Sequence, residues 1–108
     1  MFTVVLSESA QKDIRQNTSW WSENRSAEQA ERWYVGIIDK IYSLENMPTR
    51  CAQAPEAAKL NLDIRNLLFG ISSRPTHRVL FQIDGQNVVI LRVLHMSQMT
   101  IEDAADLG

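Results

Sequence analysis

The pattern of apolar and polar residues between His77 and His95 predicts a β-hairpin. Two runs rich in Val, Ile, Leu and Phe flank Asp84-Gly85, and this dipeptide favours a tight turn because glycine accepts a positive φ. The two alternating sets of the second run are Val89, Leu91 and Val93 on one side and Val88, Ile90, Arg92 and Leu94 on the other. Since both sets are apolar apart from one arginine, we expect this run to be a central strand that is covered on both faces.

Upstream of the hairpin, the pattern predicts a strand followed by two helices. Residues 2–6 form a short β-type run, and Ser7 can cap a helix that continues to about residue 23. Ser26 and Gln29 fit a capping box at the start of a second helix. Its apolar residues repeat at i, i+3, i+4 and i+7, and we expect it to end before Pro48. The short break between the helices implies an antiparallel helical hairpin.

The remaining segments complete a β-α-α-β-β-β order. Residues 47–62 predict a loop with one helical turn at 56–60, and residues 64–70 predict a further strand. After the hairpin, Thr100 is suited to cap a short final helix through Leu107. The two helices must bury their apolar stripes against one face of the sheet. We therefore predict a single two-layer α+β domain over residues 1–108, with a helical hairpin packed on a mainly antiparallel sheet.

Composition and charge narrow the class of protein. The only cysteine is Cys51, which excludes an internal disulfide and suits a reducing compartment. The N-terminal residues do not resemble a signal peptide, and no apolar run approaches the ~20 residues that span a bilayer. We therefore expect a cytoplasmic protein without a membrane partner. The net charge of −2 argues against a general nucleic-acid binder. However, residues 57–98 carry five Lys or Arg against two Asp or Glu, and residues 99–108 carry none against three.

Several short motifs follow one another along almost the whole chain. They are Ala10 and Asp13 after the first strand, Ala30 in the second helix, Arg65-Asn66-Leu67, His77-Arg78-Val79-Leu80-Phe81, and Ile90-Leu91-Arg92-Val93-Leu94-His95. In this order and spacing they resemble the RelE/ParE superfamily of toxins from bacterial type II toxin–antitoxin systems, which includes plasmid stabilisation proteins. The resemblance implies a growth-inhibiting protein that is neutralised by a cognate antitoxin and needs no cofactor. RelE-like members cut mRNA in the ribosomal A site without a metal, and ParE-like members poison DNA gyrase.

The C-terminal residues favour the ParE-like alternative. The chain has three lysines, and no Tyr, Lys or Arg follows His95, whereas RNA-cleaving members often carry a functional Tyr or Lys there. The Val-Leu-His-x-x-x-Met ending is closer to ParE-like tails. We therefore predict a gyrase poison. The alternatives are a ribosome-dependent mRNA endoribonuclease and an inactive family member that is retained as an antitoxin-binding or regulatory subunit.

If RNA is the substrate, we expect Arg65, Arg78 and His95 to be catalytic. The histidine would transfer protons and the arginines would stabilise charge at the phosphate. Each arginine also has a structural interpretation: Arg65 as the partner of Asp63 or Glu56, and Arg78 as the partner of a carboxylate that joins the sheet to a helix. For His95 the structural alternative is a hydrogen bond to a backbone carbonyl.

Other residues are candidates for contacts with phosphate or with a partner. These candidates are Lys59, Arg74, His77 and Arg92. The two histidines lack a supporting pattern of Cys or carboxylate residues, so we predict no metal site. Helical spacing places at least two of the three tryptophans in packing roles, and an exposed one would suit an antitoxin interface. We assign antitoxin binding, as a hypothesis, to Trp21, Ile101 and Leu107.

Overall fold

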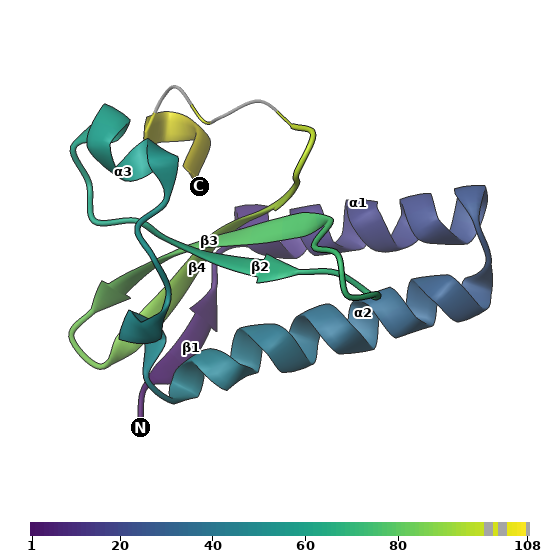
Figure 1. The fold of residues 1–108 in the computed structure, drawn as a ribbon, viewed down its shortest axis with the longest axis horizontal. Coiled ribbons are helices and arrows are strands. Elements are labelled where there is room, and N and C mark those ends of the chain that lie inside the picture. The colour runs from purple at the N-terminus through teal and green to yellow at the C-terminus, as the bar shows by residue number, and fades with distance from the viewer. Residues whose placement is uncertain (99–100, 102–103, 108) are drawn as a thin grey trace.

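A helical hairpin lies against one face of a four-stranded sheet in the computed structural model, which describes residues 1–98, 101 and 104–107 (Figure 1). The helices and strands are β1 (Thr3–Leu6), α1 (Glu8–Asn24), α2 (Ala27–Tyr42), α3 (Pro55–Leu60), β2 (Arg65–Phe69), β3 (His77–Asp84) and β4 (Asn87–His95). Short 3₁₀ turns occupy Ser43–Glu45, Pro48–Arg50 and Ala104–Leu107. The predicted α+β class and β-α-α-β-β-β order are confirmed. The final helix is a 3₁₀ turn, and the proposed cap at residue 100 lies outside the described residues.

Both long helices begin at the predicted serine caps. The hydroxyl oxygen of Ser7 accepts the backbone N–H of Ala10 at 3.0 Å, and that of Ser26 accepts the N–H of Gln29 at 3.1 Å. Each bond satisfies one of the free N–H groups at a helix start. The apolar stripe of α2 is fully buried against the sheet and contains Ala30, Trp33, Ile37 and Ile41. The local signals and the apolar period therefore determine where each helix starts and which face it buries.

The strand order is β1-β4-β3-β2, with β1 parallel to β4 and the other two pairs antiparallel. This order confirms a mainly antiparallel sheet in which the last strand is central. Asp84 pairs with Asn87, so the hairpin loop is Gly85-Gln86, one residue later than the predicted turn. Gly85 has a φ of 59°, which glycine adopts without the steric cost of a Cβ.

A β-bulge in β4 changes which side chains face the helices. Leu80 pairs with Arg92 while Phe81 pairs with Ile90, so Leu91 is an extra residue on β4. As a result, Ile90 and Val93 both join the core beneath the helices. Strict alternation had placed these two side chains on opposite faces, and that prediction is wrong because a bulge shifts the side-chain parity by one.

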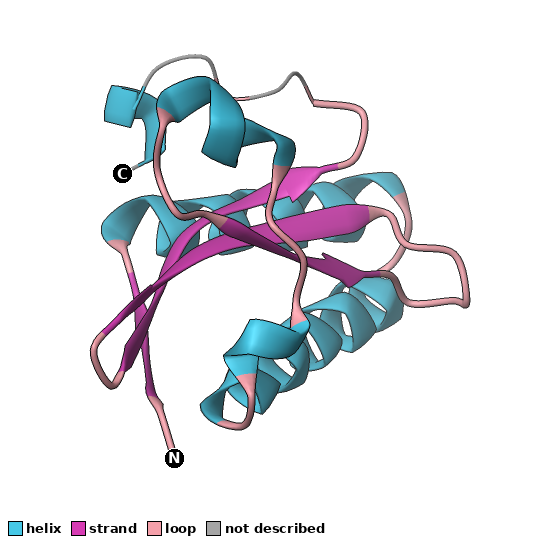
Figure 2. Ribbon diagram, turned by 60° about the vertical axis from the view of Figure 1, so that its left-hand side comes forward, coloured by secondary structure: helices cyan, strands magenta, loops and turns pink. Residues whose placement is uncertain are grey.

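The opposite face of the sheet is covered by α3 and the C-terminal 3₁₀ turn (Figure 2). The second apolar cluster on this face consists of Ala54, Ile64, Leu80, Leu94, Ile101 and Leu107. It is separate from the larger cluster under the helical hairpin. Both faces of the central strands are therefore buried, as the sequence of the last strand predicted.

Candidate functional site

A cleft of about 620 Å³ opens between the C-terminal half of α1 and the end of β4. Four of the candidate residues line it: Trp21, His77, Arg92 and His95. The other lining residues that matter below are Asp13, Gln16, Asn17, Trp20, Arg25, Ser97 and Gln98. The helical hairpin and the hairpin of strands thus bring residues from three elements to one site. Its volume is typical of a pocket that binds a ligand or a few partner side chains.

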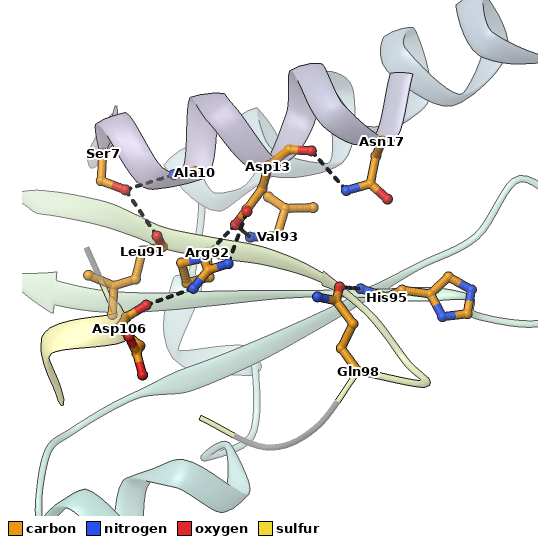
Figure 3. A network of polar contacts seen from close by, with 10 residues as sticks. All are labelled: Ser7, Ala10, Asp13, Asn17, Leu91, Arg92, Val93, His95, Gln98 and Asp106. Atoms are coloured by element: carbon orange, nitrogen blue, oxygen red, sulfur yellow. Dashed lines mark hydrogen bonds and ion pairs between the residues drawn. The ribbon is translucent and has the colours of Figure 1, made fainter. Parts of the chain in front are cut away.

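One wall of the cleft is built where β4 continues beyond β1. β1 ends opposite Ile90, and the exposed edge of β4 is then covered by α1. Ser7 donates its backbone N–H to the Ile90 carbonyl and its hydroxyl to the Leu91 carbonyl, both at 3.0 Å. The carboxylate of Asp13 accepts the N–H of Val93 at 2.9 Å (Figure 3). These bonds replace a missing neighbouring strand, because buried backbone groups need partners.

The same carboxylate fixes Arg92. Arg92 donates to the two oxygens of Asp13 at 2.6 and 3.0 Å and to the Asp106 carbonyl at 2.7 Å. The hydrogen bonds from Arg92 to Asp13, with the nearby charges of Asp13 and Asp106, raise the pKa of the guanidinium. A charge-assisted bidentate pair of this kind is strong. Arg92 therefore links α1, β4 and the C-terminal turn.

His77 forms the floor of the cleft and is buried. The indole of Trp33 donates to its Nδ1 at 3.3 Å, and Asn17 Oδ1 lies 2.9 Å from its Nε2. Because an indole N–H only donates, Nδ1 is unprotonated and Nε2 carries the proton that Asn17 accepts. Burial, with a smaller effect from the charge of His95, lowers the pKa of His77 to about 4. His77 is therefore neutral at pH 7 and joins β3 to both long helices.

His95 is exposed at the rim of the cleft. Its ring lies edge-to-face with that of His77, with centroids 5.0 Å apart. The N–H of Ser97 donates to His95 Nδ1 at 3.0 Å, and the Ser97 hydroxyl lies 2.7 Å from the same atom. The backbone N–H of His95 donates to Gln98 Oε1 at 2.6 Å. The bonds to Ser97 orient the imidazole and leave Nε2 as its protonated nitrogen in the neutral form.

The tryptophans differ in their surroundings. Trp33 is fully buried, whereas Trp21 is half-buried and packs against the main core. Trp20 is 48% exposed, and the guanidinium of Arg25 lies 5.5 Å from its ring centroid. Trp20 is therefore the most exposed of the three, while Trp21, which the sequence analysis proposed for antitoxin binding, is partly covered by its own chain.

Arg78 lies outside the cleft, in a buried ion pair. It donates to the two carboxylate oxygens of Glu56 at 2.9 and 2.5 Å, and the two residues are 8% and 0% exposed. The N–H of Ile101 also reaches Glu56 at 3.3 Å. The side-chain hydrogen bonds from Arg78 lower the pKa of the Glu56 carboxyl against the opposing effect of burial. This pair joins β3 to α3, one of the two arrangements considered for Arg78 from the sequence.

Arg65 has partners of a different kind. One guanidinium nitrogen donates to the carbonyls of Cys51 at 2.6 Å and Thr49 at 3.3 Å. Asp63, one expected partner, instead accepts a hydrogen bond from Gln53 at 2.5 Å. Arg65 therefore anchors the loop that precedes α3.

The other candidates also lie away from the cleft. Lys59 is exposed in the last turn of α3, and Arg74 is exposed in the loop before β3. Ile101 and Leu107 are buried in the second apolar cluster. Of the ten candidates, the structure thus brings four together at the cleft and distributes the other six over the rest of the described chain.

Comparison with known proteins identifies the family. A family model described as the ParE toxin of the type II toxin–antitoxin system parDE matches residues 4–100. The chain belongs to the ParE toxin family. A chain from the chromosomal ParDE toxin–antitoxin system of P. aeruginosa has a similar fold, with a TM-score of 0.70, 19% identity, and coverage of 88% of this chain and 96% of that chain. No curated protein matches the sequence.

A second solved structure, from another toxin–antitoxin complex, also has a similar fold. A chain of the toxin–antitoxin complex RelBE2 from Mycobacterium tuberculosis has a TM-score of 0.62 and 21% identity, and the match covers 87% of this chain and 96% of that chain. At these identities, the two structures establish a shared fold. The family of the chain and the fold of its neighbours agree with the resemblance to the RelE/ParE superfamily.

Two further features of this ParE family member concern metals and membranes. Within residues 1–98, 101 and 104–107, no cluster of three His, Cys, Asp or Glu side chains is arranged to hold a metal ion. In the same part of the chain, no helix combines the length and apolar character needed to cross a membrane.

The cleft of this ParE family member also contains residues that the sequence analysis did not select. Gln16 and Asn17 belong to a polar stretch of α1, and Arg25 follows the end of this helix, where such residues are ordinarily solvated. Asp13 had been noted only as part of a motif. The sequence offered one signal for these residues, a polar run that precedes two tryptophans in the first helix. This signal does not identify the strand that the run faces.

Proposed function

We propose that this ParE family member is a toxin that acts by binding DNA gyrase and is neutralised by a cognate antitoxin. The main supporting observation is the internal pairing of the two arginines that an RNA-cleaving site would need. Arg78 is buried against Glu56, and Arg65 is bound to two backbone carbonyls. The Arg78 guanidinium, which is already paired and desolvated, is poorly placed to stabilise charge on a phosphate. Arg65 is half-buried and uses one of its guanidinium nitrogens to hold its own chain.

The positions of the three catalytic candidates, Arg65, Arg78 and His95, also favour binding over RNA cleavage. His77 and His95 pair across β3 and β4 and lie on the helix side of the sheet. Arg78, the next residue, lies on the other face because side chains alternate along a strand. Arg65 pairs with Phe81, four residues along β3 from His77, which corresponds to roughly 13 Å. A common reaction centre needs groups within a few ångströms of one phosphate.

An antitoxin partner is supported by the two similar structures, both of which come from toxin–antitoxin systems. We infer that the antitoxin contacts the region of Trp21 and the adjoining exposed Trp20. Ile101 and Leu107 already pack against Leu80 and Leu94. An antitoxin would therefore reach these two residues only by displacing the C-terminal turn.

The test compares two targets side by side. The purified protein is added to DNA gyrase with relaxed plasmid, and the protein is induced in cells in which translation and mRNA ends are followed. Blocked supercoiling, accumulated DNA breaks and continued translation are the expected results. If neither gyrase nor mRNA is affected while an antitoxin still binds, the chain is an inactive member that serves as a binding or regulatory subunit.

The alternative of ribosome-dependent mRNA cleavage has one observation in its favour. His95 is exposed at the cleft and is oriented by Ser97, with its protonated Nε2 available for proton transfer. If mRNAs are cut in the ribosomal A site and His95→Ala abolishes the cuts without loss of folding, the RelE-like alternative replaces our proposal.

A further inference from the structure

We propose that the cleft between α1 and the end of β4 is a receptor for a carboxylate side chain on an acidic segment of a protein partner. The hydrogen-bond donors and acceptors that line the cleft are unequally used by the protein itself. Its internal bonds occupy the side-chain oxygens of Asp13, Asn17 and Gln98 and leave several donors without partners among the described residues. This proposal goes beyond the choice between gyrase and mRNA as target.

The acidic and buried acceptors of the cleft are occupied by the protein itself, and the free amide of Gln16 is exposed at its edge. The Asp13 carboxylate receives two bonds from Arg92 and one from the Val93 N–H. Asn17 Oδ1 accepts from His77, while the Asn17 amide nitrogen donates to the Asp13 carbonyl at 2.8 Å. The cleft therefore contains one carboxylate, and that carboxylate is already neutralised.

Three hydrogen-bond donors of the cleft lack an acceptor among the described residues, two at the rim and one buried beneath it. Ser97 N–H occupies His95 Nδ1, so the His95 Nε2–H is left for a ligand. Gln98 uses its amide oxygen to accept the His95 backbone N–H, so its NH₂ group is left as well. The indole N–H of Trp21 is buried without an acceptor in the described part of the chain, and such an unpaired donor is costly. The buried indole N–H therefore needs an acceptor, and the exposed groups of His95 and Gln98 are accessible to a ligand.

The side chains that line the cleft carry a net positive charge, which also favours a ligand with acceptor groups. Arg25 is exposed and lies over the ring of Trp20, and within the described residues its guanidinium has one acceptor, the adjacent Asn24 carbonyl at 3.4 Å. No described carboxylate lies within ion-pair distance of its guanidinium. With Arg25 and Arg92 against Asp13, the lining is positive by one charge. The ligand should therefore be an anion.

A protein carboxylate fits this site better than a nucleic acid. The chain has a net charge of −2, and Asp106 lies beside Arg92, so the phosphates of a polyanion would meet repulsion around a single positive spot. Arg25 also occupies one face of the Trp20 ring, which restricts base stacking there. The indoles instead offer apolar surface to a side chain next to the carboxylate.

The test uses an acidic peptide as the probe. Acetyl-Glu-Leu-Glu-Glu-Leu-amide is titrated into ¹⁵N-labelled full-length protein, and the indole and Arg25 side-chain signals are followed by NMR. We expect saturable shifts of the Trp20 and Trp21 indole signals and at least tenfold weaker binding of the peptide with Gln in place of Glu. Arg25→Gln should weaken binding at least fivefold.

A matched control separates a specific site from general attraction. Arg15→Gln removes the same charge from an exposed position of α1 outside the cleft, and it should change binding by less than twofold. Equal losses in the two variants, equal binding of the Gln peptide, or no saturable shift would overturn the proposal. A single-stranded oligothymidylate that binds more tightly than the peptide and shifts the same signals would also overturn it, in favour of a nucleic acid.

Discussion

The indole N–H of Trp33 in α2 donates to Nδ1 of His77 at the start of β3, and both side chains are buried. This bond, together with the one from His77 to Asn17 of α1, matches a neutral imidazole, and the Thr76 hydroxyl, 2.8 Å from the same Nδ1, can donate to it as well. A second proton would sit on Nδ1 and face the Trp33 donor. The packing of α1, α2 and β3 around His77 therefore depends on the protonation state of this imidazole.

We predict that the protein loses stability as the pH falls from about 6.5 to about 4. In the folded state burial lowers the pKa of His77 to about 4, whereas the unfolded chain protonates this residue near its ordinary pKa of about 6.5. Between these values the unfolded state binds the additional proton, so the free energy of unfolding falls by about 3 kcal/mol in total. Above about 6.5 the residue is neutral in both states and contributes no pH dependence.

Urea denaturation across this pH range measures the effect. His77→Gln, which cannot titrate, should lower stability at pH 7 and flatten the dependence between pH 6.5 and 4. His95→Gln changes the exposed imidazole of the pair and should retain most of the slope. A wild-type stability that is constant from pH 7 to pH 4.5 would contradict the assignment of a neutral, buried His77.

The ion pair between Glu56 and Arg78 yields a second prediction. Glu56→Leu or Arg78→Met alone should destabilise the protein by about 3–5 kcal/mol, because each leaves a buried charge without its partner. The double variant Glu56→Leu with Arg78→Met removes both charges and should cost less than the sum of the two single changes. A double-mutant cycle by urea denaturation measures the coupling, and strict additivity of the two losses would show that the pair is not formed.

The pH dependence of this pair occurs in a lower range than that of His77. The Glu56 pKa is lowered in the folded state, so its stabilising contribution is present above its ordinary pKa of about 4.5 and is lost as the pH falls below that value. The wild-type protein should therefore lose further stability below about pH 4.5, and Arg78→Met should reduce this acid-dependent loss.

The sequence predicted local features well and long-range ones poorly. The caps at Ser7 and Ser26 and the hairpin turn near Gly85 could be predicted because each depends on residues only a few positions apart. The bulge at Leu91 has no local signal, and it reversed the expected faces of the residues after Ile90. One inserted residue in a strand moves every later side chain of that strand to the opposite face of the sheet.

The cleft could be predicted only in part for the same reason. His77 and His95 were identifiable because polar residues stand out in apolar strands. Their partners were not, since Asn17 and His77 are 60 positions apart and Asp13 and Arg92 are 79 apart. Such pairs depend on how α1 crosses the end of β4, which no periodicity of a single segment specifies.

The link from Asp13 to the edge of β4 gives a third prediction. Asp13→Ala removes the acceptor of both Arg92 and the Val93 N–H, so β4 should open locally beyond the end of β1. Hydrogen exchange at the Val93 amide should accelerate at least tenfold, and unfolding should require about 3 kcal/mol less. Lys12→Ala, at the adjacent exposed position, should leave both quantities nearly unchanged. Unaltered protection of Val93 in Asp13→Ala would contradict this role.

Two glycines should respond differently to the same substitution. A Cβ at Gly70 would lie 2.3 Å from the carbonyl oxygen of Arg74, whereas a Cβ at Gly85 would meet nothing within 4 Å. Gly85→Ala should therefore cost only about 1 kcal/mol, from its φ of 59°. Gly70→Ala must shift the backbone of the loop before His77 and should cost more than Gly85→Ala. Thermal or urea denaturation of the two variants measures the difference, and a larger loss for Gly85→Ala would show that the loop backbone accommodates the added methyl group.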